Sequence, residues 1–173
     1  MNKKQLRSFV QKIASSKGIL TKSELSKVLL HEVNTERVPF CGPVIDLFLC
    51  KFGDSRCVTI DQFMDIWTYL EPHFKIFHRH AQNGHLSSVV YRRLICNTFQ
   101  VEFDELFFKE LEQYYGNWSF DKFVHANHHL KLLSLTVNLQ AIRNPWTMFS
   151  RLVEIKPSAP FLDEPPSYEE SVN

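Results

Sequence analysis

One pattern recurs along this chain and limits what it can fold into. An amphipathic helix is followed by a short polar turn, a brief apolar pair and a second amphipathic helix. The first copy has apolar residues at helical spacing over residues 3–13, a break at Gly18 and the pair Ile19-Leu20. Residues 21–24 then have the capping-box form Thr-x-x-Glu that begins a helix. The pattern predicts an all-α domain built from a repeated unit.

Three further copies and a weaker fifth follow. In the second, a helix over 44–52 precedes a turn at 53–56, an extended piece at 58–60 and a helix from Asp61 to Leu70. The third copy is expected to have a helix that begins near Pro72, a turn at 82–84 and a helix capped by Ser87. The fourth is expected to have a helix over 103–114, a turn at Gly116 and a helix from Asp121. The fifth comprises residues 130–139, a turn at 143–145 and a final helix.

Composition supports a packed domain and argues against several functions. In 173 residues, 44% are hydrophobic and 15 are Phe, which is enough for a sizeable core. A net charge of +1 without a dense basic run argues against nucleic acid and against direct binding to an anionic membrane. The start of the chain does not have the form of a signal peptide, and no apolar run reaches the ~20 residues needed to span a bilayer. We expect a cytoplasmic protein with reduced cysteines.

The last residues differ in composition from the rest. Pro157-Ser158-Ala159-Pro160 and Pro165-Pro166-Ser167-Tyr168 lie within twelve residues of each other. Proline fixes φ and removes a backbone donor, so this segment can form neither a helix nor a central strand and should remain extended and accessible. The sequence therefore predicts a domain over residues 1–155 and a disordered proline-rich tail over residues 156–173.

The repeats resemble the penta-EF-hand family, which includes calpain domains, sorcin, grancalcin and peflin. The resemblance covers about residues 6–153 and is most specific at 18–25, 58–70 and 118–123, which are similar to the loop exits and outgoing helices of successive hands. It implies a penta-EF-hand-like fold in which helix-loop-helix units pair through short two-stranded contacts between their loops. It also implies that the unpaired fifth hand mediates dimerisation.

The calcium ligands of that family are largely missing here. A working loop needs oxygens at its first, third and fifth positions and a bidentate carboxylate at the twelfth. The twelfth positions of the four copies hold Glu24, Gln62, Val90 and Lys122. In the first loop only Glu24 is acidic, and Asp54 is the sole early carboxylate of the second. We therefore expect no calcium, no other metal and no cofactor.

The resemblance assigns a dimer contact to the last helix. In the fifth hand, Trp146, Met148, Phe149 and Leu152 would line this contact, with either a second copy or another penta-EF-hand protein. The alternative is that these residues cover the core of their own chain.

The two tail motifs imply partners. PSAP resembles the motif read by the UEV domain of ESCRT-I, and PPSY matches the PPxY motif read by WW domains of HECT-type ubiquitin ligases. A polyproline segment has little conformational entropy to lose when it docks on an aromatic groove. The expected function is a calcium-independent adaptor that links cargo to ubiquitination and to vesicle trafficking or budding at endosomal or plasma membranes. The alternatives are a non-catalytic regulatory subunit of a calpain-like enzyme, paired through the fifth hand, and a residual calcium sensor.

Two other sets of residues invite a chemical interpretation. His125 and His129 are four residues apart, with His128 between them, but no HExxH pattern or nearby cysteine accompanies them, so we expect these histidines to face solvent or a partner. No catalytic signature surrounds any of the cysteines Cys41, Cys50, Cys57 and Cys96. The sequence therefore predicts no enzyme, and no residue is assigned a catalytic role.

Overall fold

The computed structural model of the protein describes residues 3–32, 40–139 and 145–153. The elements of this described part are short helices joined by tight loops, with two three-residue strands and two longer helices. They are α1 Lys3–Ile13, β1 Ile19–Thr21, α2 Lys22–Glu32, α3 Gly42–Phe52, β2 Cys57–Thr59, α4 Ile60–His80, α5 Ser88–Phe99, α6 Glu105–Tyr115, α7 Phe120–Thr136 and α8 Pro145–Val153. The all-α class with paired helix-loop-helix units is confirmed.

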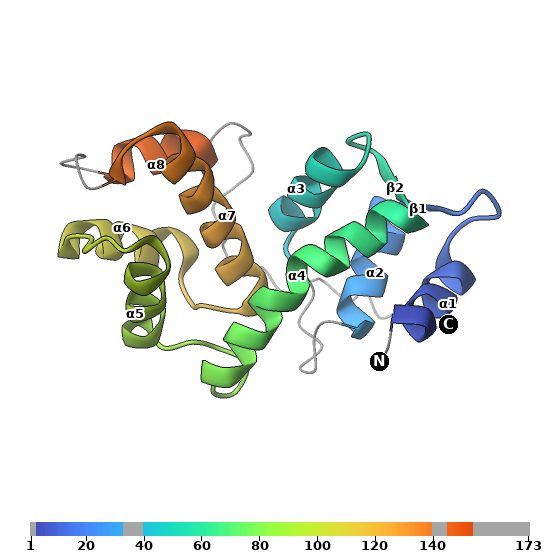
Figure 1. Ribbon diagram of the computed structural model, residues 1–173, viewed down its shortest axis with the longest axis horizontal. Coiled ribbons are helices and arrows are strands. Elements are labelled where there is room, and N and C mark those ends of the chain that lie inside the picture. The colour runs from blue at the N-terminus through green and yellow to red at the C-terminus, as the bar shows by residue number, and fades with distance from the viewer. Residues whose placement is uncertain (1–2, 33–39, 140–144, 154–173) are drawn as a thin grey trace, which may run out of the picture.

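The helix α4 connects the two halves of the molecule. Figure 1 shows α1, α2 and α3 on one side of it, with α5, α6 and α8 on the other. The prediction that a separate helix begins near Pro72 was wrong, because α4, which is 21 residues long, continues through Pro72 to His80. Pro72 lies on the exposed side of α4, so water can satisfy the Thr68 carbonyl, which has lost its amide donor. The contacts of α4 with α1, α3 and α7 offset the cost of the proline.

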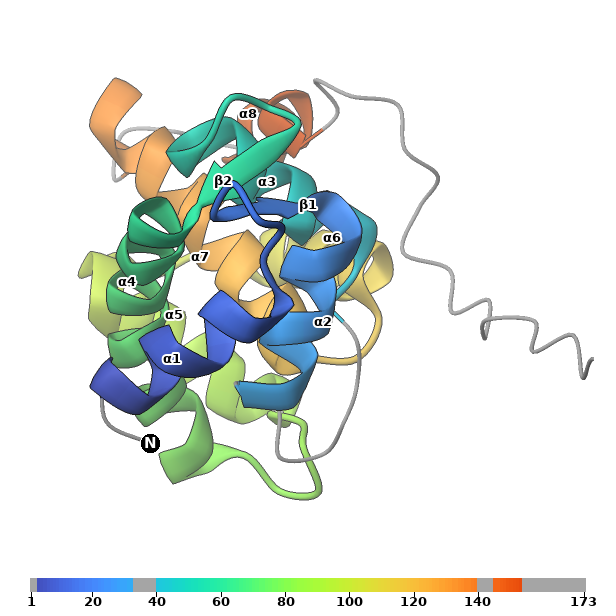
Figure 2. The same ribbon diagram turned by 90° about the vertical axis from the view of Figure 1, so that its right-hand side faces the viewer.

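The loops pair as the resemblance implied. Strands β1 and β2 are antiparallel, with Leu20 opposite Val58, and they lie side by side in Figure 2. In the other half, a single antiparallel bridge joins Leu86 to Trp118, and the Leu86 amide donates to the Trp118 carbonyl over 3.0 Å. Each bridge joins the extended residues that precede two outgoing helices, so the first hand pairs with the second and the third pairs with the fourth.

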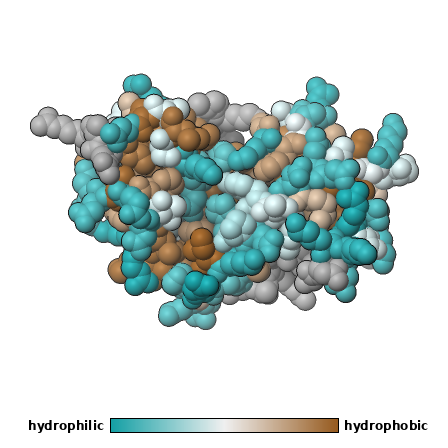
Figure 3. Space-filling view, viewed as in Figure 1, coloured by the Kyte–Doolittle hydropathy of each residue, from teal (hydrophilic) through white to brown (hydrophobic). Residues whose placement is uncertain are grey.

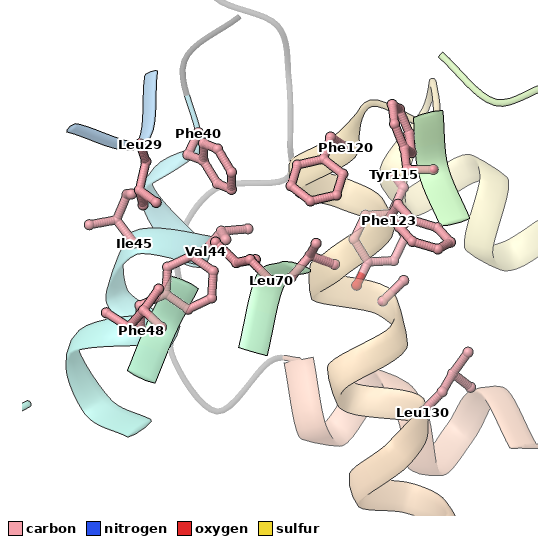
Figure 4. Packing of buried hydrophobic residues seen from close by; sticks show 14 of the residues in the cluster. Leu29, Phe40, Val44, Ile45, Phe48, Leu70, Tyr115, Phe120, Phe123 and Leu130 are labelled. Atoms are coloured by element: carbon pink, nitrogen blue, oxygen red, sulfur yellow. The ribbon is translucent and has the colours of Figure 1, made fainter. Parts of the chain in front are cut away.

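A continuous aromatic core joins the two halves. Phe40, just before α3, meets Phe120, at the start of α7, with ring centroids 5.9 Å apart and planes nearly perpendicular. Figure 4 shows these two rings facing each other, with Leu70 of α4 nearby. Phe77 of α4 adds a further ring against Phe120 at 5.2 Å. Edge-to-face geometry of this kind is favourable beyond the area that it buries.

The first eleven residues of α7 are enclosed on all sides. Every residue from 120 to 130 is buried, because α3, α4 and α8 all pack against this helix. The sequence predicted a helix from Asp121 and treated 130–139 as a separate stretch, whereas α7 is continuous to Thr136. Its last turns therefore serve as the first helix of the fifth hand, and α8, which begins at Pro145 as expected for a proline in the first helical turn, is the second.

Candidate functional site

The four loop-closing positions occupy equivalent places in the structure. Glu24, Gln62, Val90 and Lys122 are each the third residue of an outgoing helix, namely α2, α4, α5 and α7. In a calcium loop the carboxylate at this position turns back to hold the ion. The structure therefore shows what each of these side chains does in place of that role.

In the first two loops the closing side chain caps its own helix. The Glu24 carboxylate accepts hydrogen bonds from the Thr21 amide and hydroxyl, both at 2.8 Å, and the amide bond is the larger cause that lowers the pKa of Glu24. Gln62 forms a full capping box with Thr59: the Thr59 amide donates to Gln62 Oε1 over 2.8 Å, and the Gln62 amide donates to the Thr59 hydroxyl over 3.2 Å. Both closing groups satisfy backbone amides that a helix start leaves unpaired.

The single early carboxylate of the second loop, that of Asp54, bonds to the backbone of the same loop. Asp54 Oδ1 accepts from the amides of Arg56 and Cys57 at 2.9 and 2.8 Å, with the Cys57 amide the larger of the two causes that lower the pKa of Asp54. The chain is so tight here that a Cβ on Gly53 would lie 2.2 Å from the Cys57 carbonyl oxygen. Residues 53–56 connect α3 to β2, and the Asp54 carboxylate is engaged by the backbone of this loop.

The third and fourth loops have no carboxylate at the closing position. The Val90 amide donates to the Ser87 hydroxyl over 3.4 Å, so the cap is formed by the preceding serine. The Lys122 ammonium donates to Asn117 Oδ1 over 3.0 Å, and only 5% of the Lys122 residue is exposed. A positive charge already lies within the fourth loop, where it would repel an incoming cation.

Calcium is expected to leave the stability of this protein unchanged. The closing groups either carry no negative charge or are bonded within their loops, so none of these four described loops offers the six to eight oxygens that the ion requires. The melting temperature measured in millimolar calcium and in excess chelator should agree within about 1 °C. A calcium-dependent rise of several degrees would instead show that one loop rearranges and binds the ion.

The residues assigned to a dimer contact on α8 fall into two groups. Phe149 is fully buried within its own chain and packs against the rings of Phe107, Tyr115, His129 and Trp146. Met148, in contrast, is 42% exposed, and Trp146 and Leu152 are half-buried. Phe149 therefore belongs to the core, and the dimer contact remains a prediction for the other three.

Comparison with known proteins supports the fold. A solved structure of a homolog of programmed cell death 6 protein from Leishmania major Friedlin superposes with a TM-score of 0.67 at 17% sequence identity, covering 88% of this chain and 92% of that one. The fold is EF-hand-like. At this identity the likeness concerns the fold, and it supports the penta-EF-hand-like architecture. No protein-family profile and no curated protein sequence matches the chain.

The histidines of α7 are buried, so the expectation that they face solvent or a partner was wrong. His125, His128 and His129 are each less than a tenth exposed, because α3, α4 and α8 pack around this part of α7. His125 Nδ1 hydrogen bonds to the Tyr115 hydroxyl at 2.8 Å, and His129 Nδ1 donates to the His125 carbonyl at 2.9 Å. Burial is the main cause that lowers the pKa of all three, to about 2 for His125 and about 4 for His128.

Other candidate chemistry finds little support in the described residues. All four cysteines are free, and burial raises the pKa of the Cys41 thiol, which disfavours the nucleophilic thiolate. No group of three or more His, Cys, Asp or Glu side chains in the described ranges is arranged to hold a metal ion. Among the described helices, none is both long and apolar enough to pass through a bilayer.

Sequence reasoning missed one group of side chains. Lys51 of α3, His73 of α4, and His128 and Lys131 of α7 lie near one another where these helices meet. They are far apart in sequence and carry no motif, so only the packing of the helices reveals them. Both tail motifs, the predicted boundary after residue 155 and the turn at 143–144 lie outside the described residues.

Proposed function

We propose that this protein is a calcium-independent adaptor that presents its PSAP and PPSY motifs to the ESCRT-I UEV domain and to WW-domain ubiquitin ligases of the HECT type. It would thereby link cargo to ubiquitination and to vesicle trafficking or budding. The observation that carries the proposal is the occurrence of both motifs in residues 157–168, which begin four residues after α8 ends at Val153. In this proposal residues 156–173 form a tail attached to a folded body of residues 1–155.

The helical body supports this role through its closed loops. Loops that are held by their own caps need no ion to reach their final form, so the body can present the tail at any calcium concentration. Calcium sensors of this fold class use ion binding to expose an apolar groove. We propose instead that the body keeps one form with and without calcium, that it holds the tail in that form, and that it selects the cargo.

The spacing of the motifs suggests that one tail serves one partner at a time. Residues 161–164 separate PSAP from PPSY, and a polyproline-like segment rises ~3 Å per residue, so the motifs are about 15 Å apart. That is less than the diameter of a small domain, so two bound domains would collide. A dimer that presents two tails would remove this conflict and increase affinity through effective concentration.

Exposed apolar residues near α8 support dimerisation as part of the proposal. Met148 is exposed on α8, and Leu132 and Leu135 are exposed on the last turns of α7, the helix against which α8 packs. Figure 3 shows hydrophobic surface over the half of the molecule that carries α6 and α8. The same surface favours the second candidate, a non-catalytic subunit that pairs with a calpain-like enzyme. Removing residues 156–173 would abolish the adaptor function but not this pairing.

Substituting the anchors of the two motifs tests the adaptor function. Pro157→Ala should abolish UEV binding only, and Tyr168→Ala should abolish WW binding only, because each removes a ring that fills a groove. Direct titration should show micromolar binding by the wild type and a loss of at least about thirtyfold, as for a hot-spot residue worth ~2 kcal/mol. Ser171→Ala, outside both motifs, is the matched control. Equal binding by wild type and the Pro157→Ala, Tyr168→Ala double variant would refute the adaptor function.

A further inference from the structure

Four cationic or titratable side chains gather where α3, α4 and α7 meet in the middle of the molecule (Figure 1). We call Lys51, His73, His128 and Lys131 the α3–α4–α7 cationic cluster. The Lys51 ammonium donates to His128 Nδ1 over 3.4 Å and lies 4.3 Å from the centroid of the Tyr69 ring. The Tyr69 hydroxyl also reaches His128 Nδ1, at 3.3 Å. The two lysines are exposed, whereas His73 and His128 lie deeper.

No carboxylate balances this cluster among the described residues. The ion pairs of the described part involve Arg7, Lys22, Lys75 and Arg92, but neither lysine of the cluster. After burial, the charge of Lys131 is the next cause that lowers the pKa of Lys51, and Lys51 is the leading charge that lowers the pKa of His128. Neighbouring positive charges therefore destabilise one another here, and an anionic group between the two lysines would relieve that repulsion.

The sequence itself supplies an anionic segment. Residues 157–173 contain Asp163, Glu164, Glu169 and Glu170 and no Lys or Arg, whereas all 20 basic residues lie before them. The segment is long enough, because the sixteen residues from Val153 to Glu169 can span up to about 50 Å. The last described helix before it, α8, packs directly on α7, the helix that carries Lys131. Charge complementarity and reach both favour this segment as the occupant.

We propose that the acidic residues around the PPSY motif dock on the α3–α4–α7 cationic cluster and compete there with WW domains. Glu169 and Glu170 pair with Lys51 and Lys131. This pairing places the neighbouring Tyr168 against the body, where it is not available to the aromatic groove of a WW domain. This inference rests on the proposed function for its consequence, the control of WW binding, although the docking itself can be measured independently. The contact is weak, because exposed ion pairs contribute little and are screened by salt. A WW domain can therefore displace it.

The test uses the full chain in two charge-reversal variants. One is Lys51→Glu with Lys131→Glu, and the matched control is Lys12→Glu with Lys109→Glu, which reverses two exposed lysines on α1 and α6. Backbone amide NMR signals of residues 163–164 and 167–170 should shift in the first variant and not in the control. The Glu169→Gln, Glu170→Gln variant leaves the body untouched, so it provides the same comparison if the first variant does not fold. In this variant the signals of Tyr69 and His128 should shift, because the tail signals change with the substitution itself and only the body signals report docking.

WW binding is the second measurement. Reversing the cluster should strengthen binding of a WW domain to the full chain by about three- to tenfold at low salt, towards the affinity of a free peptide of residues 157–173. Tail signals that are the same in both charge-reversal variants would overturn the docking, whatever the WW affinity. A WW domain that fails to bind even the free peptide would instead overturn the proposed function, and the tail signals would still decide the docking.

Discussion

Replacing Phe149 with aspartate is expected to unfold the C-terminal half of the molecule. The side chain of Phe149 is fully buried against Phe107, Tyr115 and His129, so the substitution removes a ring from a packed aromatic cluster and buries a carboxylate without a partner. Truncating a buried Phe costs about 3–5 kcal/mol, and the buried charge adds to this cost. Chemical denaturation should therefore show a loss of more than about 4 kcal/mol in the free energy of unfolding.

Met148→Asp provides the matched control on the same helix. Met148 is largely exposed, so this substitution should change the free energy of unfolding by less than about 0.5 kcal/mol. If the dimer contact exists, Met148→Asp should instead shift the sedimentation profile towards the monomer. A Phe149→Asp protein as stable as the wild type would show that α8 does not pack as described. Loss of function in Phe149→Asp by itself would therefore report on folding and not on dimerisation.

Mild acid is expected to destabilise the fold through the histidines of α7. Burial holds the pKa of His125 at about 2 and that of His128 at about 4, whereas both residues titrate near 6.5 in the unfolded chain. Between pH 6.5 and 4 the unfolded state therefore binds more protons than the folded state, so stability is highest above pH 6.5 and falls as the pH falls. Each histidine should cost about 2 kcal/mol between pH 7.5 and 5, which is a large part of the total stability of a domain.

Urea denaturation at pH 7.5, 6.5, 5.5 and 5 would measure this slope. The range ends at pH 5 because the lowered pKa values of Glu24 and Asp54 make their carboxylates contribute to acid sensitivity only at lower pH. His128→Gln should reduce the pH dependence by about one proton, since glutamine cannot take up the charge in the unfolded state. A free energy of unfolding that is flat from pH 7.5 to 5 would contradict the burial of these imidazoles.

The closing side chains of the loops provide connections to the outgoing helices that need no ion. A calcium loop uses its closing carboxylate to join the loop to the outgoing helix. Here Glu24 and Gln62 make that connection by hydrogen bonding to the backbone, and Lys122 makes it through Asn117. A helix cap is worth about 1 kcal/mol, so such bonds maintain the loop locally without the larger free energy of ion binding. The paired bridges at Leu20–Val58 and Leu86–Trp118 then hold the loops together in pairs.

The resemblance to the penta-EF-hand family implied the pairing of the loops. The sequence by itself determined the repeated helix-loop-helix units and the chemistry of the closing positions. These features depend on hydrophobic periodicity, capping residues and turn residues, whose effects extend over a few neighbouring positions. The two proline motifs are equally local, and their function remains a prediction. The candidate site residues on α8 were found as a set, but the sequence could not show which of them face inwards.

Only the tertiary structure decided which surfaces are covered. In the folded protein α4 continues through Pro72, and Lys51 lies next to His128. The packing of other helices buries polar residues of α7 such as His125, and it places Phe149 in the core. The physical reason is that burial and charge proximity depend on how many distant helices pack around a residue. Periodicity within one helix shows which face is apolar, but it does not show whether a second or third face will also be buried.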